Sequence, residues 1–279
     1  MRRLEVGLFR ILLLCYIVMF ILDFFRTATA GLAPWDCPGC GRTGNTGNYC
    51  GRCAHPAPWI EGTSEKLSRG DFEKVGNIVK FGHYEQDNNL ENGLEEIEWI
   101  VLDVQKGKSL LISKYGLDTK PYNTTDTDVT WDTCTLRNWL NSDFLKAAFM
   151  GKEQSEILTT SVDNSKNQGY SDYSTDSGNN TQDQIFLLSY REAFDLYFKN
   201  DDERKCVPTQ YAKAQGAYIR SLYMTDGNAT GWWWLRSPAF SHFYATFVTC
   251  SGTCYYSNIN YDSGCVRPAL WINLQSDLF

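Results

Sequence analysis

The sequence is poor in histidine and has no excess of positive charge, and each shortage argues against a class of function. Only three histidines occur, His55, His83 and His242, which leaves few side chains for acid–base or triad catalysis. Lysine and arginine number 26 against 33 aspartates and glutamates, and the net charge of -7 provides no basic face to neutralise phosphates. A glycine-rich phosphate-binding loop is also lacking. We therefore expect neither a nucleic-acid-binding protein nor an enzyme of the common acid–base types.

Long apolar runs are scarce, and the one at the N-terminus bears on export. Three arginines near the start precede residues 11–22, an uncharged apolar run shorter than the ~20 residues of a membrane span. Ala28 and Ala30 then supply the small side chains that a signal peptidase reads. This pattern predicts a signal peptide at residues 1–30, with an uncleaved signal anchor over residues 8–25 as the alternative. Both predict a secreted or cell-surface protein, which would touch the membrane only through an uncleaved anchor.

Four of the ten cysteines form two C-x-x-C pairs, Cys37 with Cys40 and Cys50 with Cys53. Two such pairs can hold a tetrahedral zinc ion, with thiolates at ~2.3 Å from the metal. Two disulfides are the competing interpretation, because the exterior of a cell is oxidising. We predict a structural zinc ribbon at residues 31–56, since cysteine fills all four metal positions. A linker is expected at residues 57–74.

The main domain is expected at residues 75–279, where aromatics and apolar residues are plentiful enough for a core. Strand and helix patterns alternate irregularly along it, which predicts an α+β fold rather than a doubly wound parallel sheet. Ser189 and Glu192 have the spacing of a capping box at a helix start. Strands are expected at residues 77–81, 99–104, 109–113, 185–188, 232–235 and 266–272, a helical segment at 136–149 and a polar surface loop at 161–184.

Residues 240–265 differ in composition from the rest of the chain. They contain no Lys, Glu, Gln, Met, Trp, Pro, Leu or Arg and are rich in Phe, Tyr, Ser, Thr, Asn and Cys. Every residue type in this stretch can be encoded by a codon that ends in a pyrimidine, and all arise when adenines of an AAC or AAT codon are replaced at random. Tyr, Ser, Gly and Asn also dominate antibody binding loops, where rigid aromatic contact is combined with adaptable hydrogen bonding. The composition indicates a binding surface and favours a diversified one.

Motifs on both sides of this segment resemble those of a known family. The motifs are GNIVKFGHY at residues 76–84, EWIVL at 98–102, WDTCTLRNWL at 131–140, GWWWLRSP at 231–238 and VRPALW at 266–271. Together they resemble bacterial C-type-lectin-like domains, which are related in fold to formylglycine-generating enzymes. Some members are variable proteins of diversity-generating retroelements, whose C-terminal segment is rewritten at adenines. One departure is Cys265, which separates Gly264 from Val266 where the family commonly has Gly directly before Val-Arg-Pro.

The resemblance implies a C-type-lectin-like domain over about residues 75–275, with a variable binding region at residues 239–265. The ligand would be a protein or glycan on another cell, a phage or a host surface, and no catalytic residue is expected. The expected ligand-binding residues are Phe240, Ser241, His242, Phe243, Tyr244, Thr246, Phe247, Thr249, Ser251, Thr253, Tyr255, Tyr256, Ser257, Asn258, Asn260, Tyr261 and Ser263.

Two other hypotheses remain open. In the first, the protein is a fixed adhesion or wall-binding module. In the second it is an enzyme of the formylglycine-generating type, because the catalytic members of the fold use a pair of C-terminal cysteines and Cys250 and Cys254 lie in the right half of the chain. A reactive thiolate needs a nearby cation or histidine, and His242 is the one candidate. The alternative for Cys250, Cys254 and Cys265 is that they lie on the variable surface or that two of them form a disulfide.

Several charged residues of the domain are expected in structural roles. Arg236 and Arg267 should satisfy buried carboxylates or backbone carbonyls and hold the strands in place. Five loop aspartates lack the spacing of a calcium loop and are expected to be solvated rather than metal-binding. They are Asp126, Asp128, Asp172, Asp176 and Asp183.

Overall fold

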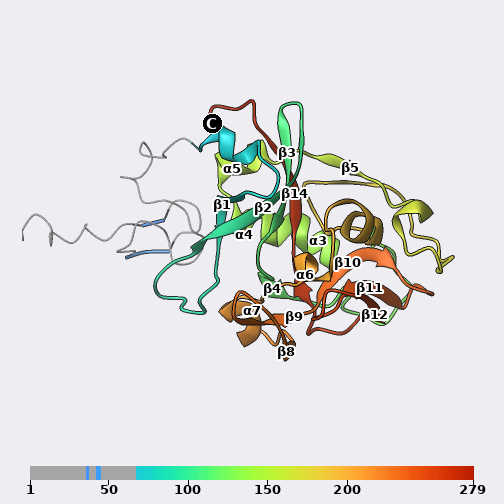
Figure 1. The fold of residues 1–279 in the computed structure, drawn as a ribbon. Coiled ribbons are helices and arrows are strands. Elements are labelled where there is room, and N and C mark those ends of the chain that lie inside the picture. Colours follow the sequence, from blue (N-terminus) through green and yellow to red (C-terminus); the bar gives the residue numbers. More distant parts are fainter. Residues whose placement is uncertain (1–35, 38–41, 45–66) are drawn as a thin grey trace, which may run out of the picture.

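The computed structural model describes residues 36–37, 42–44 and 67–279 (Figure 1). The predicted signal segment and three of the predicted zinc ligands, Cys40, Cys50 and Cys53, lie outside the described residues. The fourth, Cys37, is buried, and its backbone N–H donates a 2.8 Å hydrogen bond to the carbonyl oxygen of Arg42. Within the described part of the chain, no helix is long and apolar enough to cross a membrane.

Five antiparallel strands form the first sheet, in the order β1-β2-β3-β14-β7. They are β1 (Ile78–Tyr84), β2 (Glu95–Gln105), β3 (Lys108–Ser113), β14 (Ala269–Asn273) and β7 (Ile185–Phe186). The strands predicted at residues 99–104 and 109–113 are confirmed and pair as a hairpin, in which Gly107 adopts a positive φ of 78° that suits a two-residue turn. Strand β14, near the C-terminus, lies between β3 and β7, so the two ends of the domain share one sheet.

The second sheet also has five strands, in the order β12-β11-β10-β13-β4. They are β4 (Asp118–Thr119), β10 (Trp233–Pro238), β11 (Tyr244–Val248), β12 (Cys254–Asn258) and β13 (Cys265–Val266). Strands β10 and β13 run parallel and the other pairs are antiparallel. Two hairpins complete the strands, namely β5 (Thr160–Val162) with β6 (Thr181–Asp183) and β8 (Ile219–Thr225) with β9 (Asn228–Gly231).

The single strand expected at residues 266–272 is instead divided between the two sheets. Strand β13 ends at Val266 and β14 begins at Ala269. Between them, Pro268 has no N–H to donate to a ladder. Arg267 is buried there, and its side chain donates hydrogen bonds to the carbonyl oxygens of Ser113 (2.9 Å) and Arg204 (3.3 Å). The break therefore passes the chain from one sheet to the other.

The helices are short and connect the strands. They are α2 (Arg69–Phe72), α3 (Thr135–Trp139), the π-helical η1 (Leu140–Phe144), α4 (Leu145–Ala148), α5 (Gly151–Glu156), η2 (Lys166–Gln168), the π-helical η3 (Glu192–Leu196), α6 (Asp201–Arg204) and α7 (Gln210–Ala214). The helical periodicity predicted from Leu136 onward is confirmed by α3, η1 and α4. The predicted capping box is also formed, because Ser189 N–H donates to the Glu192 carboxylate (2.8 Å) and Glu192 N–H donates to Ser189 Oγ (3.1 Å).

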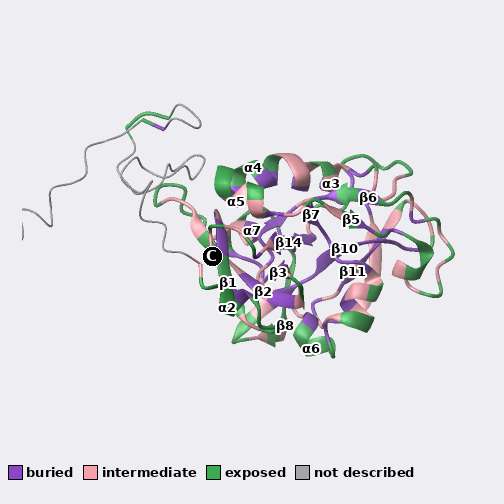
Figure 2. Cartoon of the chain, turned by 90° about the horizontal axis from the view of Figure 1, so that it is seen from above, coloured by how far each residue is buried: buried purple, intermediate pink, exposed green. Residues whose placement is uncertain are grey.

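Two segments expected to be irregular take part in the fold. Helix α2 lies in the expected linker and next to the C-terminus (Figure 1). Its Phe72 ring packs edge-on against the C-terminal Phe279, with centroids 5.0 Å apart. The expected polar loop at residues 161–184 contains the β5–β6 hairpin, whose Asp183 accepts a 2.9 Å hydrogen bond from Trp131 Nε1. Buried residues concentrate on the central strands β3, β14 and β10, and the short helices present exposed residues (Figure 2). The fold is α+β, as predicted.

Candidate ligand-binding surface

Three consecutive tryptophans, Trp232 just before β10 and Trp233 and Trp234 at its start, face in two directions, as the period of two along a strand requires. The Trp233 indole points inward, where Nε1 donates to the Arg204 carbonyl oxygen (3.0 Å) and the Arg267 guanidinium lies 4.9 Å from the ring centroid. Trp232 and Trp234 pack against each other edge to face, with centroids 4.7 Å apart. Trp232 therefore points away from Trp233 and lies beneath the outer face of the second sheet.

Aromatic side chains extend from Trp232 across the hairpin of β11 and β12. The Phe247 ring on β11 lies 4.5 Å from Trp232 and 6.0 Å from Tyr255, its cross-strand partner on β12. Tyr255 is 57% exposed and stacks on Tyr256 with centroids 4.7 Å apart. A buried tryptophan therefore supports a row of rings that reaches solvent at the edge strand of the sheet.

An open pocket of about 470 Å³ lies over this row, a volume within the usual ~300–1,000 Å³ of ligand sites. One wall comes from residues 218–223 of the β8 segment and the other from residues 247–263. Its lining combines aromatic rings, hydroxyl groups and one guanidinium, with no carboxylate. We call it the aromatic pocket, and it is lined by Tyr218, Arg220, Tyr223, Trp232, Phe247, Thr249, Cys250, Ser251, Tyr255, Tyr256, Ser257, Tyr261 and Ser263.

The pocket gathers a large part of the predicted binding residues. Those in its lining are Phe247, Thr249, Ser251, Tyr255, Tyr256, Ser257, Tyr261 and Ser263. At its rim, Thr249 Oγ1 lies 2.8 Å from both Ser251 Oγ and Thr253 Oγ1, which builds a hydroxyl cluster in the β11–β12 turn. Hydroxyl groups that both donate and accept can adapt to a polar ligand.

A second aromatic group adjoins the pocket through Tyr256. The Phe240 ring lies 4.7 Å from Tyr244 and 4.9 Å from Tyr256, and Tyr173 lies 6.3 Å from both Phe240 and Tyr256. His242 is tied to the same polar segment, because its Nε2 lies 2.8 Å from the Asp176 carbonyl oxygen. The segment at residues 161–184 therefore contributes to the surface, although its composition alone indicated a solvated loop.

Other predicted binding residues lie elsewhere. Thr246 is fully buried and donates a 2.8 Å hydrogen bond to the Ser237 carbonyl oxygen, which corrects its expected place among the ligand-contacting side chains. It points inward because its neighbour Phe247 points outward on the same strand. Outside the pocket lining are also Ser241, Phe243, Thr253, Asn258 and Asn260. Of these, Phe243 remains 38% exposed.

Sequence reasoning missed the pocket wall that β8 provides. Tyr218, Arg220 and Tyr223 belong to a run with unusually exposed apolar side chains, among them Leu222 at 71%. The available signal was this apolar and aromatic run between Gly216 and Gly227. Nothing in the sequence indicated what this run contacts, because only the fold places β8 opposite the β11–β12 hairpin.

The frame around the pocket is held by buried charge. Arg236 donates to both carboxylate oxygens of Glu192, with Nη2 2.9 Å from Oε1, and also to Asn164 Oδ1 and two backbone carbonyls. The Arg267 guanidinium likewise donates hydrogen bonds to backbone carbonyl oxygens, those of Ser113 and Arg204. The predicted structural roles of both arginines are confirmed. At Gly264, a Cβ atom would collide with the rings of Trp232 and Trp234, so glycine is required for this close approach.

The cysteines near the pocket are free thiols, with Cys250 and Cys265 buried and Cys254 partly exposed. Within residues 67–279 no disulfide forms, which excludes a pair among Cys250, Cys254 and Cys265 there. Burial raises the pKa of Cys254 to about 12 and also raises the pKa of Cys250. Cys265 is fully buried, so it is not a surface position. These thiols are poor nucleophiles near neutral pH, since the thiolate is the reactive form.

Comparison with known proteins identifies the domain by family. Residues 106–274, more than half of the chain, match the family described as "Domain of unknown function (DUF6273)". No curated protein and no solved structure matches the chain. The matched segment runs from the β2–β3 turn to β14 and includes every residue of the aromatic pocket. The chain belongs to the DUF6273 family.

Proposed function

We propose that this protein is an exported ligand-binding protein and that the aromatic pocket holds its ligand. The observation that carries this proposal is the pocket itself, where exposed Tyr255 and Tyr261 line the same cavity as Phe247 and Trp232. Tyrosine and tryptophan supply much of the energy at protein binding sites, because they bury large apolar area and keep a polar group. The lining has hydroxyls and Arg220 but no carboxylate, so it suits a neutral or anionic partner such as a glycan or a protein surface.

We further propose a C-type-lectin-like domain whose residues 240–263 have been diversified by a retroelement. Support comes from the separation of frame and surface. Trp233, Arg236 and Arg267 are buried, whereas Tyr255 and Tyr261 are exposed on the hairpin and loop that they support. Exposed positions on a rigid frame tolerate substitution without loss of the core. Buried Ala245, Thr246, Val248 and Ile259 mark positions within the segment where substitution would be restricted.

The two alternatives make different predictions from the same geometry. A fixed adhesion or wall-binding module would use the same pocket with an invariant sequence. An enzyme of the formylglycine-generating type would need a reactive thiolate at Cys250 or Cys254, which their raised pKa values disfavour. The ligand-binding hypothesis requires neither thiolate nor metal in the pocket. The export signal and the zinc ribbon at Cys37, Cys40, Cys50 and Cys53 remain part of the proposal.

Ligand binding is tested with the full-length protein on glycan and extracytoplasmic-protein arrays, using matched variants. Tyr255→Ala and Tyr261→Ala should abolish the strongest signal while the melting temperature is retained, because both side chains are exposed. Phe243→Ala, exposed on the same segment but outside the pocket, is the control and should bind normally. Equal binding by all three variants would contradict a role for the pocket.

Diversification is tested by deep sequencing of the 3′ end of the gene across one population of cells. Substitutions should gather in the codons for residues 240–263 at adenine positions of a near-copy of the segment, and codons of buried positions such as Thr246 should vary least. A segment as invariant as its frame would leave the fixed binding module as the better hypothesis.

A further inference from the structure

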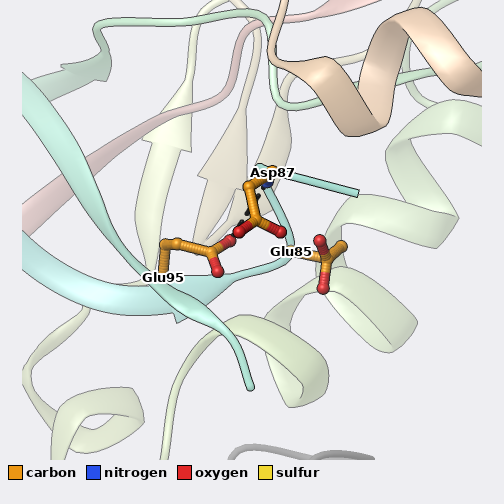
Figure 3. Close-up of side chains that lie close together, drawn as sticks. All are labelled: Glu85, Asp87 and Glu95. Atoms are coloured by element: carbon orange, nitrogen blue, oxygen red, sulfur yellow. Dashed lines mark hydrogen bonds between the residues drawn. The ribbon is translucent and has the colours of Figure 1, made fainter. Parts of the chain in front are cut away.

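The loop between β1 and β2 carries an acidic cluster outside the aromatic pocket. Glu85 directly follows β1, Asp87 lies in the loop, and Glu95 is the first residue of β2. One carboxylate oxygen from each residue lies within 4.8 Å of the other two. In the view of Figure 3 the Asp87 carboxylate lies between those of Glu95 and Glu85. Among the lysines and arginines of residues 67–279, none forms an ion pair with these carboxylates.

A buried oxygen with no hydrogen-bond donor in the described chain supplies a second observation. Glu85 is only 5% exposed, and its Oε1 accepts a 3.0 Å hydrogen bond from the Asn89 N–H. Its Oε2 is buried and accepts no hydrogen bond from the described residues. Leaving a carboxylate oxygen without a partner away from water is costly. A bound cation would compensate both the missing donor and the crowding of negative charge.

We propose that Glu85, Asp87 and Glu95 form a calcium-binding site. Carboxylate oxygens are the ligands that hard divalent cations prefer, and Ca²⁺ holds them at ~2.3–2.6 Å. Oxygens within 4.8 Å of one another can reach a single ion, and the flexible coordination of Ca²⁺ accepts such an irregular set better than the near-ideal octahedron that Mg²⁺ demands. Asp87 is exposed and Glu95 is partly exposed, which leaves an entry path from solvent.

The loop already holds these side chains in place. Asp87 accepts 2.7 Å hydrogen bonds from the Asn89 N–H and from Asn92 Nδ2, and Glu95 Oε2 accepts a 2.6 Å bond from the Gln86 N–H. The ion would therefore join the end of β1, the loop and the start of β2. Calcium binding to the folded protein should stabilise it, because an unfolded chain does not bring these carboxylates together. The site is independent of the pocket, so its test does not depend on the proposed ligand.

Thermal unfolding and calorimetric titration of the full-length protein test the site with CaCl₂ and MgCl₂ as separate probes. The melting temperature should rise by about 5 °C or more at saturating Ca²⁺ and by less with Mg²⁺. Glu85→Gln should lose this rise and should melt without calcium at a temperature no lower than the wild type, because it removes one of the crowded charges without changing shape. Glu95→Gln is a second variant on the strand and should also lose the rise. Glu91→Gln, exposed in the same loop, is the matched control and should respond like the wild type.

Two results would overturn the proposal. In the first, Ca²⁺ leaves the wild-type melting temperature unchanged, which would mean that a proton shared between Glu85 and Asp87 satisfies the cluster. In the second, Ca²⁺ stabilises Glu85→Gln and Glu95→Gln as much as the wild type, which would place the ion elsewhere in the chain. Zinc bound at the predicted cysteine ribbon would shift the melting temperature of all variants equally, so it would not produce the expected difference between the variants and the wild type.

Discussion

Replacement of Arg236 by methionine tests whether buried charge holds the frame under the pocket. The Arg236 side chain is 2% exposed, and its guanidinium donates to the Glu192 carboxylate, to Asn164 Oδ1 and to the carbonyl oxygens of Leu187 and Asp163. Methionine fills a similar volume but donates no hydrogen bond. The substitution would leave these acceptors without a donor and the Glu192 charge without its counter-ion.

The expected cost follows from the burial of the pair. Breaking a buried ion pair by removal of one partner costs about 3–5 kcal/mol, because the other charge stays buried and uncompensated. The Glu192 side chain keeps 18% exposure, so solvent lessens the penalty and the low end, about 3 kcal/mol, applies. For a domain of this size that loss lowers the melting temperature by about 6–12 °C. Adding Glu192→Gln to the variant should restore about 1 kcal/mol or more, since the uncompensated charge is removed.

Urea unfolding of Arg236→Met, Glu192→Gln and the double variant measures these differences. Arg220→Met is the control, because Arg220 is exposed and lies 5.3 Å from the Tyr223 ring, and it should change stability by no more than about 0.5 kcal/mol. A loss below about 1 kcal/mol for Arg236→Met would refute the structural role of the pair. A double variant less stable than Arg236→Met would refute the attribution of the cost to the Glu192 charge.

Three further predictions concern the pocket and the cysteines. Thr246→Val should cost about 1–2 kcal/mol in urea unfolding, because the Ser237 carbonyl oxygen loses the buried hydroxyl that donates to it; a neutral effect would mean that water replaces the hydroxyl. Cys254, whose pKa burial raises to about 12, should resist iodoacetamide at pH 7.5 in the folded protein and react after unfolding, as followed by mass spectrometry. Rapid alkylation of the native protein would revive the enzyme hypothesis. If alkylation is slow, as expected, the rate for Cys254 should rise tenfold per pH unit below about pH 12, because only the thiolate reacts. Full-length protein should carry about one zinc per chain by elemental analysis, and Cys50→Ser should lose it; equal zinc content in the variant would contradict the predicted ribbon.

Local elements of the fold could be predicted because their signals are contained in short stretches of sequence. The strand patterns at residues 99–104 and 109–113 predicted β2 and β3, where Trp99 and Val101 are fully buried. The capping box at Ser189 depends on atoms three residues apart, and the structure forms it. The helical spacing after Cys134 is likewise local. In each case the interaction that fixes the element lies within a few residues of its start.

Elements that depend on distant partners could not be predicted in the same way. The pattern at residues 266–272 indicated one strand, but the sheet partners of Val266 and Ala269 differ, and only the topology reveals the break. The exclusion of Thr246 from the binding surface depends on which face of β11 meets the core. The approach of Tyr218 and Tyr223 to the β11–β12 hairpin depends on the position of β8. A one-residue change of register would reverse which side chains face outward.

The sequence by itself determined three properties of this protein: its α+β pattern, its acidic charge and a C-terminal segment made of aromatic and small polar residues. The tertiary structure decided which of those residues meet. It gathered Tyr255, Trp232 and Phe247 in the lining of an open pocket, and it brought Glu85, Asp87 and Glu95 together around the loop between two strands. Periodicity and capping act over a few residues and are visible in the chain, whereas a pocket or an ion site forms from residues that approach only when sheet order and register are fixed.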